Sequence, residues 1–122
     1  MSDKKPTPKE RKRPNGRRPH ENRKIIFRGI SVHVGTSFDA NGINEVFLSS
    51  GGLGSQLEHD MRDAAVVMSI ALQHGATLDV ISRAVTRDEA GSPTGILGVV
   101  ADKLIDEEVQ RVADQTASTT ED

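Results

Sequence analysis

Residues that could carry enzyme chemistry are present in this chain of 122 residues, but few stand at spacings that such chemistry requires. Cysteine is absent, which excludes disulfides, thiolate nucleophiles and cysteine-ligated zinc. His59 and Asp63 are spaced by one helical turn, so they could share a metal ion, but no third ligand accompanies them. The alternative is a solvated polar face. His74 suits the end of a helix, and His33 suits a half-buried strand position. We predict no catalytic residue, no metal and no cofactor.

A glycine-rich segment offers the one local signal for an anion site. It runs from Gly51 to Ser55, and Gly52, Gly54 and Ser55 would present free backbone N–H groups at the start of a helix. The segment lacks the lysine and the spacing of a phosphate-binding P-loop, and Glu58 would repel a phosphate. An ordinary capped turn and a ligand or partner contact both remain open here.

Two Arg-Asp pairs, at Arg62 and Arg87, are the other candidate contacts. They fit structural ion pairs that fasten a helix to a loop. They equally fit a pair of arginines that binds a nucleotide or a carboxylate of a partner. The sequence leaves both interpretations open.

Charge is divided unevenly along the chain. Residues 1–24 hold ten of the sixteen Lys and Arg with three acids, a net charge of +7, and the remainder carries −9. Residues 1–22 also contain four of the five prolines and almost no apolar side chains, which predicts a disordered arm. Residues 4–24 would bind nucleic acid without sequence preference; the alternatives are a solubilising tail, or one that folds back on the acidic body. The expected phosphate contacts are Arg11, Lys12, Arg13, Arg17 and Arg18.

Apolar periodicity predicts the elements behind the arm. A strand is expected over 24–34, where apolar residues alternate, followed by a turn at 39–42 and an antiparallel return strand over 43–49. A long helix should begin after Ser55, with a capping box to Glu58. Its apolar stripe comprises Leu57, Met61, Ala64, Ala65, Met68, Ala71 and Leu72.

Two further helices are expected before the C-terminus. Thr77 caps a short helix that ends near Arg87, and a third helix runs from about Ile96 to Val112. Gly98 lowers the helix propensity of this third element by about 1 kcal/mol relative to Ala. Residues 113–122 are polar and acidic, and we expect them to fray.

Together these elements predict an α+β fold of two layers, in which an N-terminal antiparallel β-hairpin packs on about three helices. The expected organisation is a disordered basic arm over 1–22, a domain over 23–112 and an acidic flexible tail over 113–122. The open strand edges would favour a homo-oligomer or docking on a protein partner. No apolar run is long enough to cross a membrane and no secretory signal is evident, so a cytoplasmic protein is expected.

The order of these elements and their local sequences resemble the TSCPD domain family over roughly residues 26–108. The resemblance is carried by Asn44–Leu48 followed by Gly51–Ser55, by Arg62–Ala65 and Met68–Gly75, and by Ser92-Pro93 with Gly95–Gly98. The chain departs from the family's namesake motif at Ser92, where the family has a cysteine before the proline. A metal or redox role for that position is therefore not expected.

The resemblance implies a stand-alone bacterial relative of the appendage found in adenosylcobalamin-dependent ribonucleotide reductases. Ribonucleotide reduction requires a thiyl radical and a reducing thiol pair, and this chain contains no thiol. We therefore expect a non-catalytic accessory module, linked by family to ribonucleoside-diphosphate reductase and DNA synthesis, that docks on a partner or self-associates. The alternative is an accessory protein that binds nucleic acid or nucleotides through the arm. A small hydrolase is disfavoured, because no set of nucleophile, base and orienting residue is evident.

Overall fold

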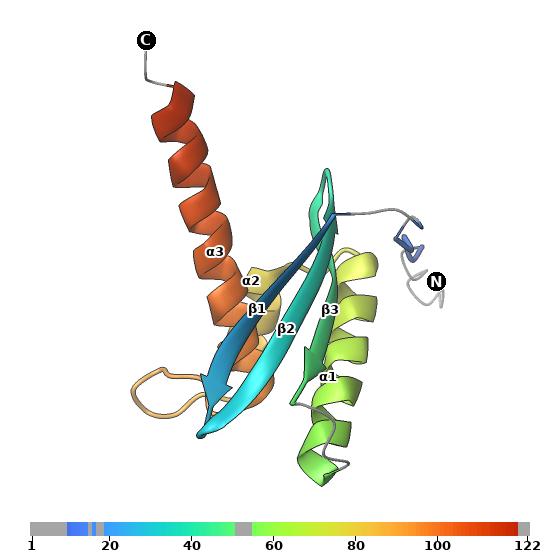
Figure 1. The fold of residues 1–122 in the computed structure, drawn as a ribbon, viewed down its shortest axis with the longest axis vertical. Coiled ribbons are helices and arrows are strands. Elements are labelled where there is room, and N and C mark those ends of the chain that lie inside the picture. Colours follow the sequence, from blue (N-terminus) through green and yellow to red (C-terminus); the bar gives the residue numbers. More distant parts are fainter. Residues whose placement is uncertain (1–9, 15, 17–18, 51–54, 120–122) are drawn as a thin grey trace, which may run out of the picture.

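The computed structural model describes residues 10–14, 16, 19–50 and 55–119, with side chains up to Thr116 (Figure 1). Its sheet has three antiparallel strands in the order β1-β2-β3, and three helices follow in the chain. The helices pack on one face of this sheet, so the predicted two-layer α+β class is confirmed. The elements are β1 (His20–Phe27), β2 (Ile30–Asp39), β3 (Gly42–Ser49), α1 (Gln56–Gln73), α2 (Leu78–Ala84) and α3 (Ile96–Thr119).

The third strand arises because the strand expected over 24–34 is in fact two strands joined by a tight turn. Arg28 and Gly29 both have positive φ, 51° and 79°, the conformation of a two-residue hairpin loop whose twist matches that of its strands. Phe27 then pairs with Ile30, and Ile25 with Val32. The turn therefore brings Ile25 and Phe27 to the same face as the alternate apolar residues of β2, not to the opposite face as a continuous strand would require.

The first strand also begins earlier than expected. His20 already pairs with Ser37, so the last residues of the predicted arm belong to the sheet. Further upstream, the Lys12 backbone N–H donates to the Gln73 carbonyl (2.9 Å), and Arg11 Nε donates to Gln73 Oε1 (2.6 Å). This part of the arm folds back on the last turn of α1, where cationic side chains complement the helix dipole. Residues 1–9, 15, 17 and 18, and with them Arg17 and Arg18, lie outside the described residues.

Helix α1 begins as predicted but uses only half of the capping box. The Glu58 backbone N–H donates to Ser55 Oγ (3.2 Å), which satisfies one of the free N–H groups of the first turn. The Glu58 carboxylate does not return to Ser55; it accepts instead from the backbone and side chain of Ser50 at the end of β3. Glu58 thus ties the last strand to the first helix.

The later helices differ from expectation at their ends. Thr77 Oγ1 accepts from the Val80 N–H (3.1 Å) and caps α2 as predicted, but α2 ends at Ala84. Helix α3 continues to Thr119, so it extends past the expected end at Val112 and residues 113–119 are helical. A side-chain hydrogen bond from Gln110 to Asp114 (2.9 Å) supports this extension.

The core lies between the sheet and the helices and is aliphatic, as the composition predicts. None of the helices in the described part of the chain has the length and apolarity needed to span a bilayer. The buried hydrophobic residues are Val32, Val34, Val46, Leu48, Met61, Ala65, Met68, Leu78, Val100, Ala101 and Leu104.

Candidate functional site

The arginines singled out from sequence are engaged in separate structural contacts. Arg62 Nε lies 2.9 Å from Glu58 Oε1 on its own helix, so Arg62 pairs with Glu58 and not with Asp63. Arg87 Nη2 lies 2.7 Å from Asp102 Oδ1 on α3 and also donates to Ser82 Oγ (2.7 Å). The two guanidinium groups therefore do not share a partner among the described residues: Arg62 pairs within α1, and Arg87 fastens its loop to α3.

Arg87 closes the loop between α2 and α3. Besides Asp102, it donates to the Ser82 carbonyl (2.9 Å) and to the Gly91 carbonyl (2.9 Å). Hydrogen bonding to Arg87, reinforced by Ser82, lowers the pKa of Asp102, and the same contact raises the pKa of Arg87. Asp88 does not pair with Arg87; its carboxylate accepts from the N–H groups of Ala90 and Ser92 within the loop. These contacts support the structural interpretation of Arg87.

The start of α1 is occupied by a carboxylate of the protein itself. Hydrogen bonds from the Ser50 side chain and backbone, then from Arg62, hold the pKa of Glu58 at about 2. Its side chain is 3% exposed, so a fixed negative charge sits beside the first turn. An anion would have to approach this charge, which disfavours a phosphate at Ser55. Gly52 and Gly54, the other two candidates in this turn, lie outside the described residues.

The histidines and carboxylates form no metal centre in the described part of the chain, where no three of them cluster suitably. His59 and Asp63 lie on exposed positions of α1. His33 is exposed on β2, which corrects its expected half-buried position, because the earlier turn reverses the face assignment. His74 caps the end of α1, as expected.

A groove of about 660 Å³ lies where the β2–β3 turn meets the end of α1 and the start of α2. Its charged lining residues are Glu10, Lys12, Asp39 and Glu108, so acids predominate. Asn44 also lines it; Asn44 Nδ2 donates to Asp39 (3.1 Å), and Oδ1 is the one buried side-chain polar atom in the described residues without a partner. Such an acceptor-rich lining does not favour a phosphate-bearing nucleotide.

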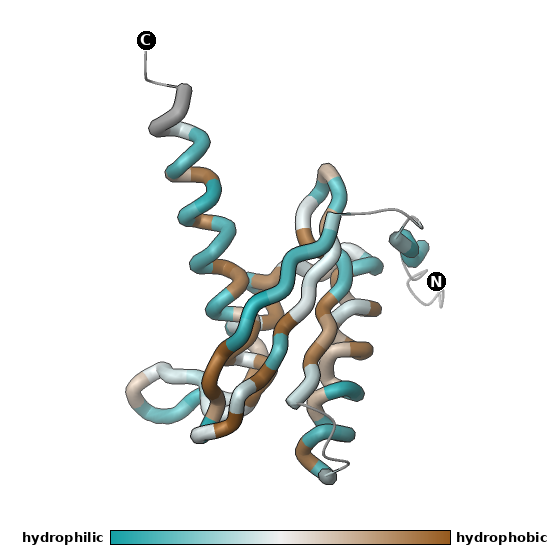
Figure 2. Tube along the Cα trace, in the orientation of Figure 1, coloured by the Kyte–Doolittle hydropathy of each residue, from teal (hydrophilic) through white to brown (hydrophobic). Residues whose placement is uncertain are grey.

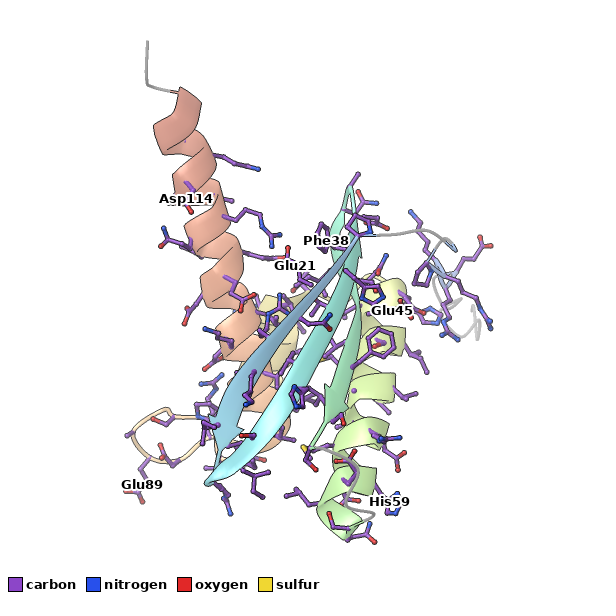
Figure 3. The ribbon with its side chains drawn as sticks, viewed as in Figure 1. Glu21, Phe38, Glu45, His59, Glu89 and Asp114 are labelled. Carbon is purple, nitrogen blue, oxygen red and sulfur yellow. The ribbon has the colours of Figure 1, made fainter. Side chains whose placement is uncertain are left out.

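A charged network fastens α3 to β1 near the β2–β3 turn. Glu21 lies between β1 and α3 (Figure 3) and accepts from Arg111 Nη2 (2.8 Å). Arg23, only 13% exposed, contacts Glu21 (3.1 Å) and Glu107 (2.9 Å). The Arg111 guanidinium also lies 5.3 Å from the centre of the Phe38 ring. Up to Arg111, α3 is therefore held against the sheet.

Beyond this network, α3 projects away from the rest of the molecule (Figure 1). Val109 and Val112, on either side of Arg111 in the C-terminal half of α3, are 64% and 61% exposed, and Figure 2 shows hydrophobic positions recurring along this half among hydrophilic ones. From the sequence, this helix was expected to end at Val112, with Val109 on or near its apolar stripe. The absence of Gly or Pro from 99 to 119 was the signal that a longer helix follows.

The face of the sheet away from the helices brings together residues that sequence reasoning left apart. The His20 and Phe47 rings lie 6.0 Å apart between centroids, and Phe47 is 45% exposed. Lys24 and His33 are directly paired neighbours on the same face and are both exposed. Finding this group from sequence requires the register of all three strands. That register could not be predicted, because the first two strands were expected to be one.

Comparisons of the chain with protein-family models, with curated proteins and with solved structures find no match. The resemblance to the TSCPD domain family accordingly stays a prediction from the sequence.

Proposed function

We propose that this chain is a non-catalytic accessory module that docks on a protein partner through the projecting half of α3. The observation that carries the proposal is the exposed pair Val109 and Val112 on a helix that extends past its own core. Helix α3, with 24 residues, spans about 36 Å. Helix α2 has only seven residues, so it can pack against only part of that length.

The exposed pair continues a side of α3 that is already a helix-packing surface. Gly98 lies against Val85 just after α2, and Asp102 bonds Ser82 on α2. Ile105, Val109 and Val112 extend the same stripe at spacings of three and four residues. A partner helix that bound there would pack on the same side of α3 as α2, further towards the C-terminus.

The energetics favour such an occupant. Burying a valine contributes about 1.5–3 kcal/mol, so two valines and the half-buried Ile105 provide a compact apolar anchor. A helix gains most of its stability from packing an apolar face, and a partner would supply such packing for the exposed valines.

The family resemblance points to the kind of partner. A TSCPD-like chain without thiols has no means of reducing a ribonucleotide alone, but it can attach to the enzyme that does. We therefore place the module beside a ribonucleoside-diphosphate reductase, with a second copy of the chain as the other occupant to test.

The test is a double substitution, V109D/V112D, in the full chain. Asp has a helix propensity similar to that of Val, so the fold should keep its stability within about 0.5 kcal/mol. Binding to the adenosylcobalamin-dependent reductase of the same cell, measured by calorimetry, should weaken at least about 100-fold. If the stripe joins two copies instead, light scattering will show a wild-type dimer and a monomeric variant.

The matched control is V66D/V67D, which changes two valines of similar exposure, 56% and 65%, on α1. This variant should bind like the wild type. A wild-type chain that stays monomeric and does not bind the reductase, or equal losses in both variants, would contradict the proposal.

A further inference from the structure

The uncovered face of the sheet carries a built aromatic platform. Gly35 forms its floor: a Cβ there would lie 3.0 Å from Asn22 Oδ1 and 3.6 Å from Phe47 Cβ. The missing side chain lets Asn22 and Phe47 close over the backbone of β2. Next to them, His20 covers Ser37, whose Oγ lies 3.4 Å from His20 Nε2. The rings are thus held against the sheet while Phe47 stays 45% exposed.

Counted together with the arm, the solvent-accessible charges around this platform have a small basic excess, with Lys24, Lys12 and Arg13 against Glu45 and Glu10. Among the outward positions of the paired stretches, Lys24 is a permanent cation and Glu45 is the one acid. The exposed side chains of Lys12 and Arg13 belong to the arm, which is fixed at Gln73. Gln73 in turn donates to the Asn44 carbonyl (3.0 Å), next to the row that contains His20. The arm therefore lies at the platform's end of the sheet, beside the groove that Lys12 lines with Glu10, Asp39 and Glu108.

The acids of the body gather on the other layer. The helices carry exposed carboxylates along their length, whereas the sheet face has little negative charge. This separation makes the sheet face and the arm the side of the molecule that a polyanion can approach. The exposed acids on the helices include Asp60, Asp63, Asp79, Asp106 and Asp114.

We infer that the outer face of the sheet binds single-stranded nucleic acid, with a base stacked on Phe47 beside His20. Phosphates contact Lys24 and the arm cations Lys12 and Arg13. An open antiparallel sheet face with an aromatic ring and flanking cations is suited to unpaired bases, since every base offers a flat face for stacking. The inference goes beyond the proposed docking through α3, because it uses the opposite layer of the molecule.

This arrangement makes a different prediction from a basic arm acting alone. A flexible cationic segment neutralises phosphates of single strands and duplexes alike. A ring on a flat sheet contacts only bases that are unstacked, so it adds a preference for single strands. Phe47 should therefore determine the preference for single strands, and the arm should determine the dependence on salt.

The experiment measures fluorescence anisotropy of a labelled 20-nucleotide oligothymidine and of a duplex of equal length, across a salt series. We expect the full chain to prefer the single strand by at least about tenfold. F47A should lose about tenfold in affinity for the single strand with an unchanged salt slope. F47W should restore binding, because it restores the aromatic surface.

The arm variant K12A/R13A should lower the salt slope by about two and weaken single strands and duplex alike. V66A, at a position 56% exposed on the helical layer, is the matched control and should bind like the wild type. Equal affinity of F47A and wild type, equal binding of duplex and single strand, or no binding at about 50 mM salt would overturn the inference. None of these outcomes depends on Val109 and Val112, so failure here and failure of the α3 docking are distinguishable.

Discussion

At the scale of single residues, Glu58 is a buried carboxylate with a strongly lowered pKa. It is buried to 3% exposure, and its carboxylate accepts from Ser50 and Arg62. The Ser50 side chain is the main cause of the depressed pKa, about 2 in place of the ordinary 4.5. A depressed pKa in the folded state means that the ionised carboxylate stabilises the fold.

This linkage predicts an acid-sensitive difference between wild type and E58Q. The stabilisation by Glu58 is fully present above about pH 4.5 and is lost as the pH falls towards 2. Urea unfolding should therefore show E58Q to be less stable than wild type at pH 7, with a gap that shrinks steadily below pH 4.5. A gap that is constant from pH 7 to pH 2.5 would contradict the role of the ionised carboxylate.

Residue-level signals in the sequence were reliable where they are local. Ser55 and Thr77 cap the helices that they were expected to cap. A cap requires only that a side-chain oxygen accept a hydrogen bond from the N–H three residues later, so it depends on local sequence alone. The turn at Arg28 was missed because a bulky residue with positive φ is uncommon and no Asn or Asp marks the site. Glu58 has the spacing of a capping box, but in the fold Ser50 lies close to it and donates hydrogen bonds to its carboxylate.

At the scale of elements, Gly98 shows how a loop and a helix constrain each other. From sequence it is only a weak helix former, and its replacement by Ala should stabilise α3 by about 1 kcal/mol. In the fold, a Cβ at this position would lie 2.7 Å from Pro93 Cβ and 3.0 Å from Val85 Cγ2. Pro93 is itself held by a bridge to Arg87, so it has little room to move.

We therefore predict that G98A destabilises the chain by about 1 kcal/mol net, as overpacking outweighs the gain in propensity. The free energy of urea unfolding measures this. G95A is the control, because a Cβ there meets nothing within 4 Å, and it should leave stability unchanged or slightly higher. A stabilised G98A would show that the loop at Pro93 yields easily.

The elements themselves were largely predictable, whereas their pairing was not. Periodicity located three helices and the β3 strand, because each buries one continuous face. Periodicity alone does not reveal where a strand reverses, so the predicted face of Ile25 and the predicted half-burial of His33 were wrong. The platform of His20 and Phe47 depends on that reversal, so the sequence did not predict that these two residues lie together.

At the scale of the whole molecule, the two halves of α3 differ in what holds them. The first half is part of the core through Val100 and Leu104, and Arg111 ties the helix to Glu21 on the sheet. Beyond Arg111 the helix projects away from the core, so we expect its amides to be less protected than those of the first half.

We predict that amide hydrogen exchange, followed by mass spectrometry, will be fast over 112–119 in the isolated chain and slow over 97–107. In the complex or dimer expected for α3, exchange over 112–119 should slow by at least about tenfold. The V109D/V112D variant should lack this second effect. Strong protection of 112–119 in the monomer would mean that the projecting half is stable without a partner.

The path of the chain also bears on how the molecule assembles. The three strands follow one another in a meander, and α1 packs on the strand that precedes it, so most contacts form between segments that are close in sequence. Such topologies fold quickly. The bond between Glu21 and Arg111 joins residues 90 positions apart, and it forms only once the last helix is in place. On the ribosome, the sheet and α1 can therefore assemble while α3 is still being synthesised, and the arrival of α3 fastens the first strand last.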